Sequence, residues 1–255
     1  MLETLRTARG VWRSLGIYYG WRQRHRSRAM DALYARFVKR GDLVFDIGAH
    51  VGDRVAAFRR LGAKVVAVEP QPALAFTIGM LYQHGLFAYF PGSNVFVERK
   101  AVGRKAGDVR LMVNTDNPTV TTASNAFIDA AQDAPGWQGQ RWDKSIRVPM
   151  TTLDALIDEH GVPAFIKIDV EGFEEEVLMG LTQPVAALSF EFTTIQRDVA
   201  RACVARCAAL GLTQFNGAIG ESQEIGDWRS AETIGRWLDE LPHEANSGDV
   251  YALRP

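Results

Sequence analysis

The sequence predicts an α/β protein with a mostly parallel, twisted sheet and helices on both faces. From Leu43 onward, short β-rich runs alternate with helical patterns, as in βαβ units around a parallel sheet. Runs such as LVFDI and AFIKIDV are almost continuously apolar, as expected of strands that helices cover on both sides. The 255 residues are 47% hydrophobic and 23% charged, which is typical of globular proteins.

The expected elements follow one another in a regular order. Strands are predicted at Leu43–Ile47, Lys64–Glu69, Val95–Val102, Ala164–Val170 and Ala187–Phe192. Helical patterns between and after them predict helices at Asp53–Leu61, Pro72–His84, Leu153–His160, Phe173–Leu181 and Arg197–Leu210. A short strand after Leu212, a helix at Ser230–Leu241 and a last strand at Val250–Leu253 close a single domain over residues 41–255.

Residues 103–149 interrupt this rhythm and are interpreted as an insertion in the domain. Gly107–Val113 alternates like a hairpin strand. Residues 114–145 are polar and rich in turn formers, and a stretch of this length is typical of a functional lid or substrate loop.

Residues 1–40 are interpreted as a basic, aromatic helical arm. They hold ten Lys and Arg against two acids, whereas the remainder holds nineteen against twenty-eight. Trp12, Tyr18, Tyr19 and Trp21 are interleaved with arginines, a composition typical of an interfacial helix. The arm is expected to meet an anionic phospholipid surface, a phosphorylated substrate or the protein's own acidic body. A helix that only caps the core would have the same composition.

The chain carries no long apolar run for a membrane span and no secretory signal pattern. Its two cysteines, Cys203 and Cys207, lie four residues apart without a nearby His to complete a zinc site. We expect buried, reduced thiols and a cytoplasmic protein, which the arm could hold at a membrane surface.

The first chemical motif is DIGAHVG, at the end of the first strand. Gly48 and Gly52 allow a tight turn and a close approach to a ligand. Position 50 is His50 rather than Gly, and the motif lacks the lysine of a phosphate-binding loop, which argues against a dinucleotide or a triphosphate. Asp46 suits a ligand with positive charge. The alternative is a glycine turn that only tightens strand-to-helix packing.

The second motif is VVAVEP, which places Glu69 at the end of the second strand, twenty-one residues after Gly48. An acid there can accept hydrogen bonds from both hydroxyls of a ribose. Nicotinamide and S-adenosylmethionine sites share this feature, so Glu69 alone does not distinguish between these two cofactors. Glu69 could instead cap the helix that follows Pro70.

The third motif is FIKIDVEGFE, whose alternation places Lys167, Asp169 and Glu171 on one face of a strand. Glu191 occupies a similar position on the next strand. Buried charges are costly unless they are paired or used, so this sheet edge is a candidate site. An ion pair between Lys167 and Glu171 or Glu191 is the structural alternative.

Taken together, these motifs resemble the FkbM family of S-adenosylmethionine-dependent methyltransferases. The matching text is VFDIGAHVGD, VVAVEPQP, KAVGRKAGDVRL, TTLDALID, IKIDVEGFEEEVLMG and LSFEF, between Gly41 and Thr193. The resemblance implies a Rossmann-like methyltransferase fold with an antiparallel C-terminal strand, to which Val250–Leu253 would correspond. It also implies O-methylation of a hydroxyl on a small molecule or glycan, with S-adenosylmethionine as cofactor.

The resemblance also implies roles for individual residues. Cofactor contacts would come from Asp46, Gly48, Ala49, Gly52, Glu69, Ala101, Val102 and Asp169. Glu69 would hold the ribose, Ala101 and Val102 would lie near the adenine, and the D-x-E-G signature ending in Gly172 would lie beside the transferred methyl.

A hydroxyl acceptor needs a base, and the candidates are Asp169 and Glu171, followed by Glu191 and His50. Two carboxylates could instead bind a divalent cation, but no metal ligands are assigned. A nicotinamide-dependent oxidoreductase and a non-catalytic binding or assembly protein on the same scaffold remain alternative functions. No nucleic acid partner is expected.

Overall fold

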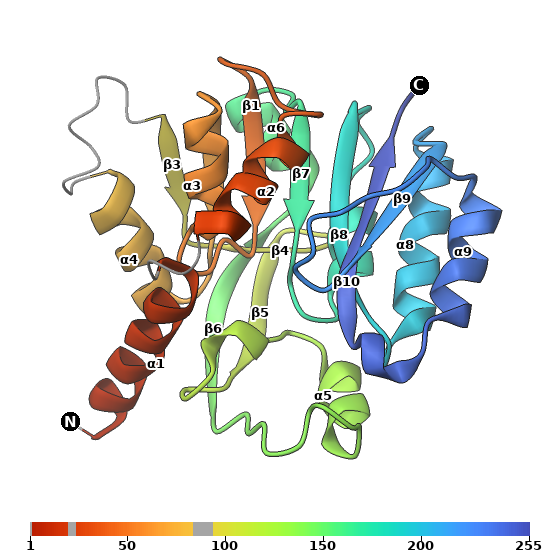
Figure 1. The fold of residues 1–255 in the computed structure, drawn as a ribbon. Helices are drawn as coiled ribbons and strands as arrows, with labels where there is room; N and C mark the ends of the chain where they lie inside the picture. The colour runs from red at the N-terminus through yellow and green to blue at the C-terminus, as the bar shows by residue number, and fades with distance from the viewer. Residues whose placement is uncertain (1, 20–23, 84–93) are drawn as a thin grey trace.

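A central seven-stranded sheet organises the molecule in the computed structural model, which describes residues 2–19, 24–83 and 94–255. The strand order is β3-β2-β1-β7-β8-β10-β9 (Figure 1). These strands span Val95–Glu98, Lys64–Val68, Leu43–Ile47, Phe165–Ile168, Ala187–Thr193, Ser247–Leu253 and Gln214–Ile219, in that order. The strands β3, β2, β1, β7 and β8 are parallel neighbours, and β10 runs antiparallel to β8 and β9. The predicted α/β class and antiparallel C-terminal strand are confirmed.

Helices cover both faces of this sheet because its strands alternate between two apolar clusters. Phe45 and Ile47 of β1 pack in one cluster with α6, α7, α8 and α9, whereas Val44 packs in the other with α2 and α3. The helices span Arg24–Tyr34 (α2), Asp53–Arg60 (α3), Pro72–Tyr82 (α4), Leu153–His160 (α6), Glu174–Met179 (α7), Arg197–Ala209 (α8) and Ala231–Glu240 (α9). Cys203 and Cys207 are buried free thiols in α8, as expected.

A second sheet of three strands, ordered β4-β6-β5, lies beside the main one. Its strands are Ala101–Val102 (β4), Gly107–Val113 (β5) and Lys144–Thr151 (β6). The prediction of one strand over Val95–Val102 is therefore wrong, because the chain leaves the main sheet after Glu98. The hairpin strand Gly107–Val113 is confirmed, and its partner is β6.

The stretch interpreted as a polar loop, residues 114–145, contains structure of its own. It includes a 3₁₀ turn, η3, at Pro118–Val120 and the helix α5 at Asn125–Gln132. The Ser124 side chain accepts a hydrogen bond from the Phe127 N–H at the start of α5. Trp137 and Trp142 pack against Phe127, so most of this stretch is a small packed unit.

Helix α1, Leu2–Tyr19, lies against α4 and η3 at one end of the molecule (Figure 1). Val11 and Leu15 pack against Leu74 of α4. Arg6 pairs with Asp116 at 2.6 Å, so the basic arm does meet the acidic body in part. Trp21 and His84, the predicted end of the fourth helix, lie outside the described residues. No helix of the described ranges is both long and apolar enough to cross a bilayer.

Candidate functional site

A cavity that is open to solvent lies at the carboxyl ends of β1, β2 and β7. It is the edge at which open α/β sheets bind ligands. Ten of the twelve predicted site positions line it, namely Asp46, Gly48, Ala49, His50, Glu69, Ala101, Val102, Asp169, Glu171 and Glu191. Gly172, next to Glu171, is not among the lining residues. Gly52 does not line it.

The glycine loop after β1 is held by close packing between backbones. Gly48 has φ of 84°, and a Cβ added there would lie 1.8 Å from the carbonyl oxygen of Asp169. Its N–H and that of Ala49 both donate to the carbonyl of Val68. The loop, β2 and the turn after β7 are thereby fixed against one another, so Gly48 is required by this contact as well as by its backbone conformation.

Gly52 has a different role from the one predicted. It precedes α3 with φ of 82°, and an added Cβ would lie 2.9 Å from the ring of Tyr82 in α4. Gly52 therefore allows α3 and α4 to pack closely.

Asp46 is 2% exposed at the floor of the cavity. Its Oδ2 atom finds no hydrogen-bond partner among the described residues. Burial, reinforced by the charge of Asp53, raises the pKa of Asp46 to about 7. An unpaired buried carboxylate that faces a cavity favours a ligand with positive charge.

Glu69 is buried in the cavity wall, and both its oxygens accept backbone hydrogen bonds. The donors are the N–H groups of His50 at 2.9 Å and Gln71 at 2.8 Å. The Gln71 contact is the predicted capping alternative, since Gln71 immediately precedes α4. Each carboxylate oxygen keeps a second lone pair, so a hydroxyl of a ligand can still be bound. Burial raises the pKa of Glu69 to about 8.

Three carboxylates gather where β7 and β8 end. Oxygen atoms of Asp169, Glu171 and Glu191 lie within 4.8 Å of one another. The prediction that Glu171 continues the strand face of Asp169 is wrong, because β7 ends at Ile168 and Glu171 has φ of 56°. This left-handed turn, rather than strand alternation, brings Glu171 beside Glu191. Such an oxygen-rich group can also hold a hard divalent cation.

Lys167 lies beneath this group, fully buried in the sheet. Its ammonium lies 3.1 Å from Asp169 and 2.9 Å from Asp249 of β10. The structural alternative, an ion pair of Lys167 with Glu171 or Glu191, is therefore wrong. The missing partner, Asp249, comes from a strand 82 positions later in the printed sequence.

The surroundings of the three acids shift their pKa values in different directions. Burial alone would raise the pKa of Asp169, but Lys167 and Arg54 hold it below its usual value. Burial and the charge of Asp169 raise the pKa values of Glu171 and Glu191 well above the usual range. Like charges this close together cannot all ionise easily, so the pKa of Asp169 and the pKa values of the two glutamates are pushed in opposite directions.

His50 lies in the loop with φ of 51°, an uncommon conformation for this residue type. Its ring packs edge-on against Tyr18, with centroids 5.5 Å apart. Burial lowers the pKa of His50 to about 4, so the ring is neutral at pH 7 and is a weaker base than a glutamate with a raised pKa.

Sequence reasoning missed an ion-pair network at the cavity wall. Asp53 accepts from Arg26 at 2.8 Å and Arg54 at 2.6 Å, and Glu221 accepts from the same two arginines. Asp53 and Arg54 follow the glycine motif directly, so their place near the site could have been predicted from the sequence. Glu221 follows β9, and nothing in the sequence indicates that it lies at the cavity wall, because only the fold brings it there.

Tyr18 of α1 is a further cavity residue that the sequence did not predict. It lines the cavity, and the guanidinium of Arg26 lies 5.2 Å from its ring centroid. The neighbouring Tyr19 donates from its hydroxyl to the carbonyl of Val51. The arm therefore contributes to the wall of the site.

The 3₁₀ turn η3 and the residues after it form a roof over the cavity. Pro118, Thr119 and Thr121 line it. The Gln71 amide donates to the Pro118 carbonyl at 3.3 Å, and the hydroxyl of Thr122 donates to the Glu171 carbonyl at 2.6 Å. This part of the predicted substrate loop faces the cavity. A residue has to line the cavity in order to contact an acceptor there.

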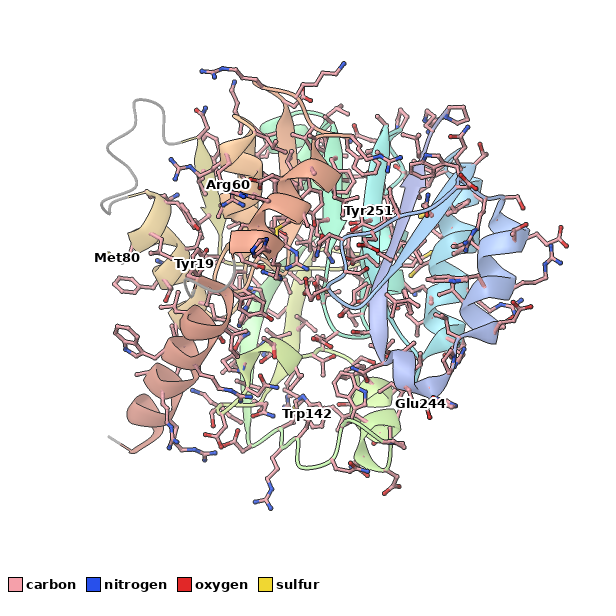
Figure 2. The ribbon with its side chains drawn as sticks, viewed as in Figure 1. Tyr19, Arg60, Met80, Trp142, Glu244 and Tyr251 are labelled. Carbon is pink, nitrogen blue, oxygen red and sulfur yellow. The ribbon has the colours of Figure 1, made fainter. Side chains whose placement is uncertain are left out.

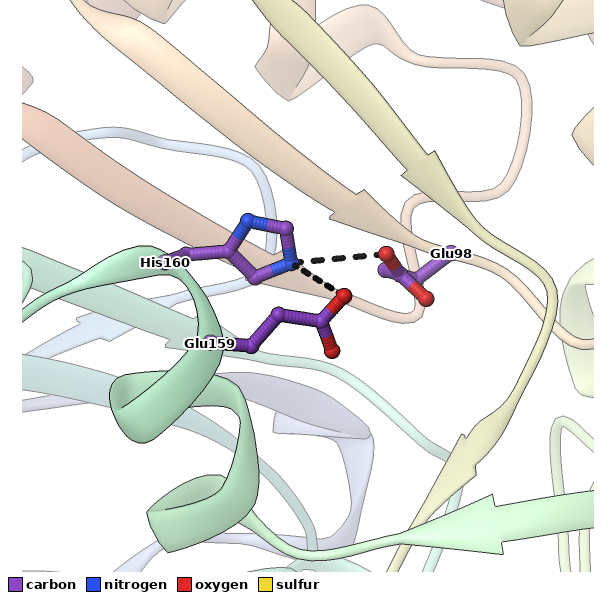
Figure 3. A group of neighbouring side chains, drawn as sticks. All are labelled: Glu98, Glu159 and His160. Carbon is purple, nitrogen blue, oxygen red and sulfur yellow. Dashed lines mark ion pairs between the residues drawn. The ribbon is translucent and has the colours of Figure 1, made fainter.

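A further cluster, Glu98, Glu159 and His160, lies near the end of β3 (Figure 3). The Nε2 atom of His160 lies 3.3 Å from Glu98. The ammonium of Lys100 lies 2.8 Å from Glu98 and 3.8 Å from Glu159. Because a lysine already supplies the positive charge there, the cluster is explained as a structural network.

Most of the chain matches a known protein family. The family description "Methyltransferase FkbM domain" matches residues 46–246. No curated protein sequence matches the chain. Among solved structures, the magnesium protoporphyrin IX methyltransferase of Synechocystis PCC 6803, solved with S-adenosylmethionine, is 12% identical with a TM-score of 0.47, over 96% of this chain and 84% of that one. A precorrin-6y C5,15-methyltransferase from Geobacter metallireducens is 11% identical with a TM-score of 0.44, over 90% and 87%.

Proposed function

Because the chain belongs to the FkbM methyltransferase family, we propose that it transfers a methyl group from S-adenosylmethionine to a hydroxyl of a small molecule or glycan. The observation that carries the O-methylation proposal is the group of Asp169, Glu171 and Glu191 at one end of the cavity. A hydroxyl is a poor nucleophile until a base removes its proton. This group supplies carboxylates for that task.

The residues present fit the cofactor. The unpaired carboxylate of Asp46 would face its positive charge, and Glu69 would accept from the ribose hydroxyls. Ala101 and Val102 offer apolar wall for the adenine. Bound S-adenosylmethionine supplies an electrophilic methyl group on a positively charged sulfur. Positive charge near Glu171 and Glu191 would lower their raised pKa values and free a carboxylate.

In the proposed reaction, the acceptor oxygen gains the methyl group and its proton passes to Glu171 or Glu191. Lys167 fixes Asp169 in its charged form at 3.1 Å, and Asp169 in turn is a cofactor contact. The roof of Pro118, Thr119 and Thr121 would hold the acceptor in line with the methyl group.

A product assay tests the O-methylation step. The protein is incubated with S-adenosylmethionine and a panel of sugars and hydroxylated metabolites, and products are identified by mass spectrometry. We expect methyl ethers and release of the demethylated cofactor. Methylation only at nitrogen or carbon would contradict the proposal. Cofactor binding without any product across the panel would favour the non-catalytic alternative.

The cofactor affinity should depend on pH through Asp46. A cation favours the ionised carboxylate, whereas the free protein holds its pKa at about 7. Affinity should therefore rise with pH up to about 7 and fall by about tenfold per pH unit below it, the limit for one coupled proton. Calorimetry between pH 6 and pH 8 measures this slope, to which Glu69 also contributes. Asp46→Asn should flatten it, and the exposed Asp129→Asn should not.

Replacing Glu69 by Ala should weaken cofactor binding by about 1.5–3 kcal/mol, the range for hydrogen bonds to a charged group. The same change removes the acceptor for the Gln71 N–H, so unfolding is measured separately. Glu159→Ala, at a half-exposed glutamate outside the cavity, is the matched control. Unchanged affinity in Glu69→Ala would show that Glu69 only caps α4.

We also infer a cytoplasmic setting, supported by two buried cysteines that stay free.

A further inference from the structure

Large apolar side chains are exposed mainly on two neighbouring helices. Trp12 is 75% and Ile17 46% exposed on α1, and Phe76 is 60% and Met80 47% exposed on α4. The helices are held together through Val11 and Leu74. Figure 2 shows Met80 at the same end of the molecule as Tyr19, the last residue of α1. We call Trp12, Phe76 and Met80 the α1–α4 face.

Helix α4 is unusual for a helix on the outside of a domain. Its sequence, PALAFTIGMLY, has no charged residue. Leu74, Ala75 and Ile78 are buried against the protein, while Phe76 and Met80 lie one turn apart on the outer side. A helix that faces only water normally carries charge on its outer side, so this side is suited to an apolar environment.

Helix α1 adds positive charge around this apolar surface. Arg9 and Arg13 are exposed. Trp12 lies about one turn from Arg9 on the outer side of the helix, whereas Arg13 donates to the carbonyl of Asp116 at 3.2 Å. Residues 1–40 hold ten Lys and Arg against two acids. Arginines beside an exposed tryptophan are typical of helices that lie in a membrane interface. They match the negative potential of anionic lipids.

We propose that the α1–α4 face is the docking surface for an anionic phospholipid bilayer. Trp12, Phe76 and Met80 enter the headgroup boundary, while Arg9 contacts lipid phosphates. The opposite side of α1 presents Tyr18 to the cavity, so docking places the bilayer next to the site. This proposal is independent of the acceptor and of methyl transfer.

Vesicle flotation of the full chain tests the apolar part of this proposal. The protein should float with vesicles of phosphatidylcholine and phosphatidylserine and much less with phosphatidylcholine alone. In the double variant Trp12→Ser, Phe76→Ser, binding to the anionic vesicles should weaken by about tenfold or more. The matched control is Val162→Ser, because Val162 is 59% exposed in the loop between α6 and β7. Equal thermal unfolding of all variants confirms that each is folded.

Charge reversal tests the electrostatic part. Arg9→Glu should weaken binding to the anionic vesicles by about tenfold, and added salt should weaken binding of the unmodified protein. Arg236→Glu on α9 is the control, since Arg236 is 65% exposed at the other end of the sheet. The proposal is overturned if the protein ignores anionic vesicles, or if the controls lose as much binding. It is also overturned if ultracentrifugation finds a dimer that the double variant dissociates, which would assign the face to a second copy.

Discussion

Turnover should fall by about 10²–10⁴ in Asp169→Asn and in Glu171→Gln, the range for loss of a catalytic acid or base. Both changes keep the side-chain shape and remove a carboxylate from the group that lines the cavity. Cofactor affinity should change much less in Glu171→Gln than in Asp169→Asn, because Asp169 is also a predicted cofactor contact. Methyl transfer under saturating cofactor and calorimetry on the same preparations separate these effects.

Glu232→Gln, at an 83% exposed side chain on α9, is the control. If both active-site variants turn over at a near-normal rate, the base has to be sought at Glu191 or His50. A chelator adds a second comparison. If the three carboxylates hold a divalent cation, the chelator abolishes activity of the unmodified protein and the ion restores it. If they act only as bases, the chelator has no effect.

Gly48→Ala should destabilise the protein by about 2–5 kcal/mol and abolish cofactor binding. A left-handed backbone costs a residue with a Cβ about 1–2 kcal/mol. The new Cβ would also lie 1.8 Å from the Asp169 carbonyl oxygen, and overpacking of this kind costs about 1–3 kcal/mol. Relief of the clash requires the glycine loop to move away from the turn that carries Asp169, which opens the site.

Urea denaturation and calorimetry measure the two effects. Gly235→Ala on α9 is the matched control, because nothing lies within 4 Å of its added Cβ. It should be neutral or stabilising by up to about 1 kcal/mol, since alanine favours helix. A Gly48→Ala variant that unfolds and binds cofactor like the parent protein would show that the loop and the turn are not in contact in solution.

The parts of the fold that could be predicted are those in which one local pattern decides the outcome. The β1 and β7 runs are apolar throughout and could only be buried strands. Strand β6 was missed because it is largely exposed, contains Pro149 and depends on pairing with β5. Local sequence also gave no sign that the chain would change sheets after Glu98.

The candidate site divides in the same way. Asp46 and Glu69 follow strands, and strand ends meet at one edge of a parallel sheet, so their meeting could be predicted. The position of Glu171 depends on a left-handed turn that no periodicity shows. Tyr18, Glu221 and the Lys167 partner Asp249 come from distant segments that only tertiary packing brings together.

Calorimetric titration with S-adenosylmethionine and, separately, with NAD tests the central claim most directly. We expect saturable binding of S-adenosylmethionine that weakens in both Asp46→Asn and Glu69→Ala, and no binding of NAD. Binding of NAD in place of S-adenosylmethionine, or an S-adenosylmethionine affinity that neither variant changes, would contradict it.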